Sequence, residues 1–82
     1  MKTTIRDILA KHGRLPAPVG GLSDDDDLHA AGLTSFGSVE VMMALEEAFG
    51  IEFPDRMLNR RNFSSISAIE QAVMTVQAEE AA

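Results

Sequence analysis

Apolar residues recur at helical spacing in three separate stretches of the chain. The stretches run from about residue 3 to 12, from about 35 to 49 and from about 66 to 78. Intervals of three or four residues between apolar side chains are typical of a helix that buries one face. The pattern therefore predicts three main helices. The alternation of Ile51, Glu52 and Phe53 is too short to predict a β-strand.

Each predicted helix has its own core face and its own end signals. The positions expected to face the core are Ile5, Ile8 and Leu9 in the first helix, Val39, Met42, Leu45 and Phe49 in the second, and Ile66, Ile69, Val73 and Val76 in the third. Gly13 and Gly50 are expected to end the first two helices. Thr3 or Thr4 is expected to cap the first. For the third helix the cap is Ser67, in a capping box with Glu70, or else Ser64 or Ser65, and residues 79–82 are expected to fray.

The connections between these helices differ in length. The first, residues 14–34, begins with residues 15–21, whose two prolines and two glycines break a helix. Leucines within it are expected to anchor it to the core, namely Leu22, Leu28 and Leu33. The second connection has Pro54 at a turn that leads into a short helix near Asp55–Arg60. The sequence thus predicts an all-α fold: a small antiparallel bundle of three main helices plus one short helix, with a long first loop, in one domain spanning residues 1–82.

Composition and charge exclude several classes of function. The chain has 82 residues, 45% of them hydrophobic, and no cysteine, so disulfides, a cysteine nucleophile and a cysteine-ligated zinc site are excluded. It has no apolar run near the ~20 residues of a membrane span and no signal-peptide pattern. A cytoplasmic monomer that does not bind membranes is expected. The acidic run 24–27 fails as a calcium loop, because His29 and Ser35 replace the required glycine and glutamate, and no metal site is predicted.

The net charge of −6 is unevenly distributed. Residues 35–55 carry five acidic and no basic side chains, whereas residues 56–61 carry three arginines. An acidic surface repels nucleic acid and can steer a partner that presents lysine or arginine. We therefore expect protein partners and no nucleic acid.

Ser35 is the candidate chemical site, because it lies where the first loop becomes the second helix. The first turn of a helix has unpaired backbone N–H groups and the positive end of the helix dipole, which together suit a phosphate group. The structural alternative is that Ser35 only caps the helix. No catalytic residue is predicted: His12 and His29 form no recognisable triad, and Glu46 and Glu47 point about 100° apart on a helix. His29, six residues before Ser35, could meet a group bound there.

The segment from Leu28 to Phe36 resembles the L-x-x-x-G-L-D-S-L attachment loop of acyl carrier proteins. The resemblance continues through the second helix into F-G-I-E-F-P-D at residues 49–55, and covers most of the chain from about Ile5 to Val76. It implies that Ser35 carries 4′-phosphopantetheine, transferred from coenzyme A by a phosphopantetheinyl transferase. It also implies that the thiol of this arm holds the cargo as a thioester. The lack of cysteine agrees with a thiol supplied by the arm.

Departures from the usual pattern point to a subgroup. Thr34 stands where most acyl carrier proteins have aspartate, Phe36 replaces leucine, and the three arginines lie where the short helix is usually acidic. This combination resembles small bacterial carriers that are charged with an amino acid by stand-alone ligases similar to class II aminoacyl-tRNA synthetases. Glycine or alanine is the cargo that the resemblance implies.

We therefore expect a carrier protein and not an enzyme. Its partners would be the transferase, an amino acid:carrier protein ligase or other acyl-loading enzyme, and a downstream acyl-transferring enzyme. The residues expected to contact partners are Thr34, Phe36, Glu40, Met43, Glu47, Arg56, Arg60 and Arg61. One alternative is an acyl carrier protein of a polyketide, peptide-synthetase or specialised lipid pathway. A second alternative, from another class of protein, is an unmodified acidic helical adaptor that binds a basic protein. Its best support is Thr34, which replaces the aspartate usual in acyl carrier proteins.

Overall fold

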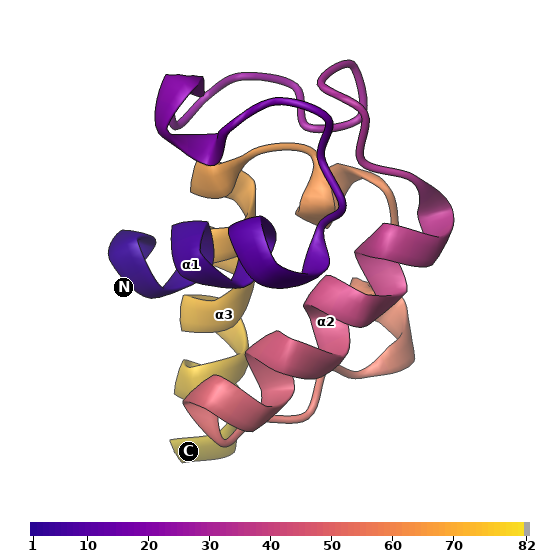
Figure 1. The fold of residues 1–82 in the computed structure, drawn as a ribbon. Coiled ribbons are helices and arrows are strands. Elements are labelled where there is room, and N and C mark those ends of the chain that lie inside the picture. Colours follow the sequence, from indigo (N-terminus) through magenta and orange to yellow (C-terminus); the bar gives the residue numbers. More distant parts are fainter. Residues whose placement is uncertain (82) are drawn as a thin grey trace.

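The computed structural model describes residues 1–81, and all its regular elements are helical (Figure 1). In chain order, its elements are α1 (Lys2–His12), the 3₁₀ turn η1 (Val19–Gly21), α2 (Ser35–Phe49), the 3₁₀ turns η2 (Asp55–Met57) and η3 (Arg61–Phe63), and α3 (Ile66–Ala81). No strand occurs within these residues. The predicted all-α fold with three main helices and a long first loop is confirmed.

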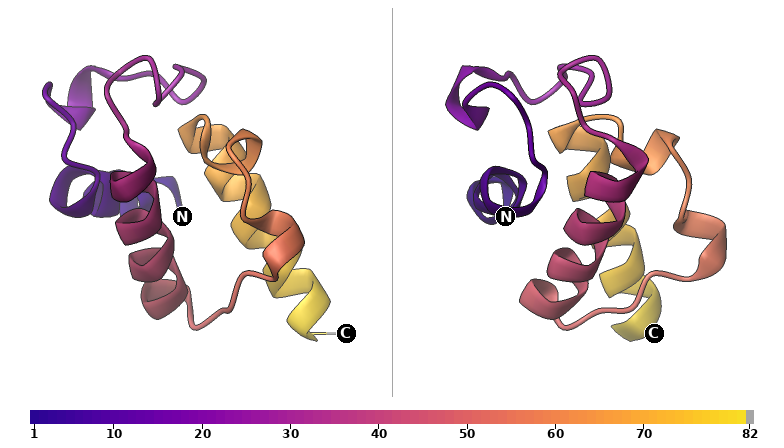
Figure 2. Two further views of the ribbon diagram at one scale, coloured as in Figure 1. Left: turned by 90° about the vertical axis from the view of Figure 1, so that its right-hand side faces the viewer. Right: turned by 45° about the vertical axis from the view of Figure 1, so that its right-hand side comes forward.

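The helix α1 packs across both α2 and α3, and the long first connection passes over one end of the bundle (Figures 1 and 2). Both α2 and α3 begin at that covered end and run in the same general direction (Figure 2). The antiparallel arrangement expected for helices joined by turns does not apply to this pair. The reason is that residues 50–65 return along the outside of the bundle before α3 begins.

Local hydrogen bonds explain where α2 and α3 begin and where α2 ends. The side chain of Thr34 accepts a hydrogen bond from the Gly37 N–H at 3.0 Å, which makes Thr34 the N-cap of α2. Gly50 ends α2 in the left-handed conformation, with φ 62°, as predicted. Among the three candidate serines, Ser65 caps α3, because its Oγ accepts from the Ala68 N–H at 3.0 Å.

Two predictions about helix ends were wrong, namely the cap of α1 and the fraying of α3. Neither Thr3 nor Thr4 caps α1, because that helix begins at Lys2, after Met1. Gly13 ends α1 as predicted, in a right-handed conformation, and the left-handed residue is Arg14, which follows it. The helix α3 continues to Ala81, so the expected fraying from Glu79 is not seen. Position 82, the last of the residues expected to fray, lies outside the described residues.

The core faces of α1 and α3 are those predicted, whereas the face of α2 is predicted only in part, with Leu45 buried as expected. Val41 and Leu45 are buried on α2, together with Gly37, whereas Val39 is exposed. Met42 and Phe49 are only partly buried against the core. Val39 was misassigned and Val41 was missed because apolar residues lie on nearly every side of α2, so that spacing alone does not select the buried side.

The connection between α2 and α3 contains two 3₁₀ turns in place of the predicted short helix over Asp55–Arg60. Side chains from the helices hold its first part. The Phe53 N–H donates to Glu46 of α2 at 2.8 Å, and the Glu52 N–H donates to Glu80 of α3 at 3.0 Å. Arg56 forms an ion pair with Glu79, and this contact lowers the pKa of Glu79.

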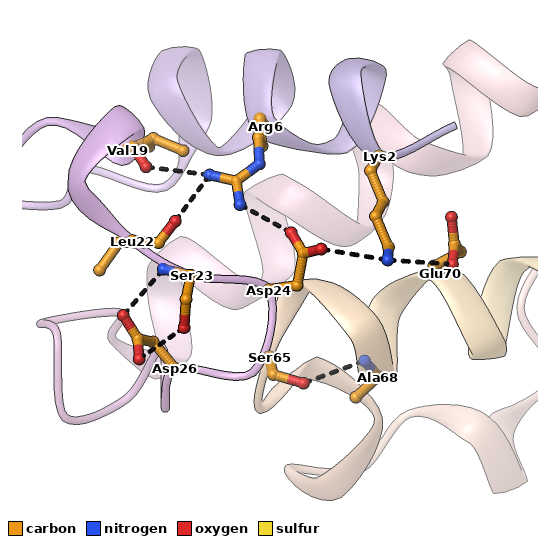
Figure 3. A network of polar contacts seen from close by, with 10 residues as sticks. All are labelled: Lys2, Arg6, Val19, Leu22, Ser23, Asp24, Asp26, Ser65, Ala68 and Glu70. Atoms are coloured by element: carbon orange, nitrogen blue, oxygen red, sulfur yellow. Dashed lines mark hydrogen bonds and ion pairs between the residues drawn. The ribbon is translucent and has the colours of Figure 1, made fainter.

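Polar contacts fasten the first connection to the helices (Figure 3). Arg6 of α1 donates to the Val19 and Leu22 carbonyls at 3.1 and 2.9 Å, and to the Asp24 carboxylate at 2.7 Å. Lys2 adds an ion pair to Asp24 at 3.1 Å. These hydrogen bonds from Arg6 and Lys2 lower the pKa of Asp24. Leu28 and Leu33 are buried and Leu22 is partly buried, so the predicted leucine anchors are confirmed.

Candidate functional site

Ser35 is the first residue of α2 and its side chain is exposed. Because Thr34 supplies the capping oxygen, the structural alternative that Ser35 only caps the helix is wrong. The N–H groups of Ser35 and Phe36 precede the first hydrogen bond within the helix, which joins Ser38 N to the Thr34 carbonyl at 2.8 Å. The first turn of α2 carries no acidic side chain. The local field at the Ser35 hydroxyl therefore favours a phosphate ester.

A cavity of about 260 Å³ opens beside Ser35, between α2 and the second connection. The residues that line it are His29, Ser35, Ser38, Val39, Met42, Leu58, Asn59, Arg60 and Phe63. Within residues 1–81, the Ser38 hydroxyl oxygen is buried without a hydrogen-bond partner, and a buried hydroxyl in this state can bond an incoming polar group. An arm that starts at Ser35 thus has an adjacent cavity with both apolar and polar walls, so the site fits a prosthetic group attached there.

His29 forms part of the cavity wall. One ring nitrogen, Nδ1, lies 3.3 Å from the Leu33 carbonyl oxygen, and the other, Nε2, lies 3.4 Å from the Arg60 carbonyl oxygen. The ring therefore bridges the loop before Ser35 and the second connection. This places His29 where the sequence suggested, near any group held at Ser35, while His12 lies exposed on α1.

The predicted partner-contact residues of the α2 region extend along the helix from its N-cap, Thr34, to Glu47, and Phe36 directly follows the serine. Phe36 and Met43 are 65% and 60% exposed, and Val39, which the sequence had placed in the core, is 51% exposed. Large apolar side chains with such exposure mark a surface suited to protein contact. Thr34 and Glu47 are also exposed, so they too are accessible to a partner.

The three arginines do not act as one group. Arg56 is paired with Glu79 near the end of α3. Arg60 and Arg61 are exposed, and Arg60 lines the cavity. Only Arg60 is thus brought directly to the Ser35 site.

Several side chains of this region were not identified from the sequence as part of it: Arg14, Ser38, Val39, Met42, Leu58, Asn59 and Phe63. Their contribution depends on how the two connections fold over α2, and nothing in the local sequence indicates this. Arg14 lies with its guanidinium carbon 5.3 Å from the centre of the Phe36 ring, and it also pairs with Glu40. The ring and the carboxylate are thus held by a residue far away in sequence.

Two further observations concern metal binding and membrane insertion. Among residues 1–81, no group of three or more histidine or acidic side chains is arranged to hold a metal ion. None of the helices that the structure describes is long and apolar enough to cross a membrane.

Comparisons with known proteins agree with this geometry. Residues 3–73 match the family described as "Phosphopantetheine attachment site". An aminoacyl carrier protein from Agrobacterium fabrum is 58% identical over 76 residues, which cover 93% of this chain and 92% of the relative.

Solved structures give the same result. A carrier protein from Agrobacterium tumefaciens, in a crystal structure with an engineered Bradyrhizobium japonicum glycine:[carrier protein] ligase and AMP, is similar with a TM-score of 0.88 and 59% identity. That match covers 90% of this chain and 99% of the other. A solution structure of an A. tumefaciens protein matches over the full length of both chains, with a TM-score of 0.78 and 57% identity. The chain therefore belongs to the phosphopantetheine attachment family, and it is a carrier protein, not an enzyme, that bears 4′-phosphopantetheine covalently.

Proposed function

We propose that Ser35 is the attachment residue and that the arm carries an aminoacyl group as a thioester. The observation that supports the site most is that the residue capping α2 is Thr34 and not Ser35. Thr34 caps the helix, which leaves the Ser35 hydroxyl exposed at the positive end of the helix dipole and next to a cavity.

In the attachment reaction, the Ser35 oxygen would attack the phosphorus of coenzyme A that bears the pantetheine arm. A phosphodiester bond to Ser35 forms, the bond to the 3′,5′-ADP leaving group breaks, and a base of the transferase takes the hydroxyl proton. This chain therefore needs no catalytic partner beside Ser35. The chain itself holds the Ser35 hydroxyl in the first turn of α2 and offers a surface that the transferase recognises.

An amino acid is the preferred cargo because the relatives point to it. The A. fabrum relative is an aminoacyl carrier protein, and the A. tumefaciens carrier is bound to a glycine:[carrier protein] ligase. We propose glycine first and alanine second, with loading by a ligase of that kind and release to a downstream acyl-transferring enzyme. The polyketide, peptide-synthetase and lipid pathways remain the alternatives, while the unmodified adaptor is disfavoured because the family bears the prosthetic group.

Residues 1–82 would act as one carrier domain in the cytoplasm, where coenzyme A and ATP are available for loading. The proposed contact surface of α2 consists of Thr34, Phe36, Glu40, Met43 and Glu47. The arginines of the second connection would add selectivity for the ligase, namely Arg56, Arg60 and Arg61.

Intact mass spectrometry tests the attachment site. The wild-type chain, incubated with coenzyme A, Mg²⁺ and a broad-specificity transferase, should gain one phosphopantetheine, whereas Ser35→Ala should gain none. Ser38→Ala is the matched control, since it removes a hydroxyl one turn away and should still be modified. Modification of Ser35→Ala would disprove the site. The modified chain should then gain a glycyl group with ATP, glycine and the ligase.

A further inference from the structure

Arg14 is the only residue other than glycine, within residues 1–81, that has a positive φ, at 55°. This conformation is unfavourable for residues with a Cβ atom, which crowds the neighbouring carbonyl. It persists only where surrounding contacts enforce it, and such positions are concentrated at functional sites. Arg14 is therefore a candidate for a functional role.

Close packing between α1 and α2 places Arg14 beside the attachment serine. The carbonyl oxygen of Gly13 faces Gly37 in the first turn of α2, and a Cβ atom on Gly37 would lie only 2.9 Å from that oxygen. The absence of a Cβ atom on Gly37 thus lets the end of α1 approach the start of α2. Arg14 follows this contact directly, and its side chain reaches the exposed surface of the same turn.

The Arg14 guanidinium contacts two side chains of α2, the half-buried Glu40 and the exposed Phe36. Its Nη2 donates to Glu40 Oε1 at 3.0 Å and its Nε donates to Glu40 Oε2 at 3.3 Å. Its central carbon lies 5.3 Å from the centre of the Phe36 ring, within the range of a cation–π interaction. A two-bond contact fixes the orientation of the guanidinium plane, so the ring of Phe36 has an oriented partner although it is 65% exposed.

We propose that Arg14 is a positioning residue that holds Phe36 as an ordered docking anchor for the transferase that modifies Ser35. This inference rests on the proposed attachment at Ser35. An aromatic side chain that is ordered beforehand loses less rotamer entropy when a partner covers it. The pairing also occupies Glu40, which leaves Glu47 as the acidic residue of this surface available to a basic partner.

The test is a double-mutant cycle on transferase kinetics, with coenzyme A saturating and the carrier varied. Arg14→Ala should raise the carrier KM about two- to fivefold, the range expected from an exposed cation–π contact, with kcat unchanged. Phe36→Ala should raise KM at least as much. The double variant should be no worse than Phe36→Ala alone, because Arg14 acts through the ring. Lys11→Ala, which also removes one exposed positive charge, should leave KM unchanged.

Two further variants separate positioning from folding. Arg14→Gly adopts the positive φ without strain and should show the same rise in KM as Arg14→Ala. Arg14→Lys keeps the charge but not the two-bond geometry and should recover part of the loss. Additive effects in the double variant, or an unchanged KM in Arg14→Gly, would overturn the proposal. Every Arg14 variant should still reach full modification with time, whereas failure of the wild type to be modified would instead contradict the function proposed for Ser35.

Discussion

Thr34 has a specific consequence for the residue that follows it. Its hydroxyl satisfies the Gly37 N–H as an aspartate would, yet it adds no charge. A carboxylate at this position would lie close to the phosphate proposed for Ser35 and would repel it. The neutral cap therefore keeps the helix start intact and adds no negative charge beside that phosphate at the positive end of the helix dipole.

Substitution of Thr34 should separate the cap from the charge. Thr34→Ala loses the capping bond and should lower the free energy of unfolding by about 1 kcal/mol. Thr34→Asp keeps a capping oxygen and places a negative charge at the helix N-terminus, so the unmodified protein should be at least as stable as the wild type. Urea denaturation of both variants measures this. Equal stability of Thr34→Ala and the wild type would show that the cap contributes nothing.

At the scale of elements, the sequence predicted the parts that depend on local signals. The bounds of α2, its glycine stop and the core rows of α1 and α3 follow from neighbouring residues alone. The buried side of α2 does not, because Gly37 selects it by allowing contact with the Gly13 carbonyl, a residue 24 positions away. Val39 was assigned to the core for this reason, although it lines the cavity. The position of Ser35 at the start of α2 was predictable from the sequence, whereas the walls of the cavity beside it were not.

Gly37→Ala tests whether this close approach orients α2. Alanine in a helix interior is normally favoured over glycine by up to about 1 kcal/mol. Here the added methyl group would lie 2.9 Å from the Gly13 carbonyl oxygen and 3.3 Å from Leu33 Cδ1, so we expect a loss of about 1–3 kcal/mol from overpacking. Gly20→Ala is the control, because nothing lies within 4 Å of its added atom. Thermal unfolding of both variants decides the sign, and a stabilised Gly37→Ala would contradict the packing argument.

The second connection is the element proposed to select the ligase. Arg60 and Arg61 are exposed and form no ion pair within residues 1–81, so their charges are available to a partner. Reversing both to glutamate should slow aminoacylation by the ligase at low salt, with a smaller difference at high salt. The rate of phosphopantetheinylation should stay nearly the same, since that enzyme is expected to meet α2. Unchanged ligase kinetics would exclude a selective role for the basic segment.

At the scale of the whole molecule, one ionic network connects three parts of the bundle (Figure 3). Asp24 in the first connection binds Arg6 and Lys2 of α1, and its backbone carbonyl accepts from the Ser67 N–H of α3 at 2.9 Å. The same connection leads directly to Ser35. The ion pairs and hydrogen bonds of Asp24 therefore help to hold the loop before Ser35 in place over the bundle.

Acid should weaken this network selectively. The pKa of Asp24 is lowered in the folded protein by its hydrogen bonds to Arg6 and Lys2, so its contribution to stability is complete above the usual value of 3.8 and is lost as the pH falls through the lower folded value. The pKa of Lys2 is raised, chiefly by Asp24, so its contribution is lost only above the usual value of 10.5.

We expect the urea midpoint to be flat near neutral pH and to fall below about pH 4. Asp24→Asn should lower the midpoint at pH 7 and make the acid decline shallower, whereas Asp25→Asn, an equal change of charge beside it, should alter neither. A decline in Asp24→Asn as steep as in the wild type would assign the acid sensitivity to other carboxylates.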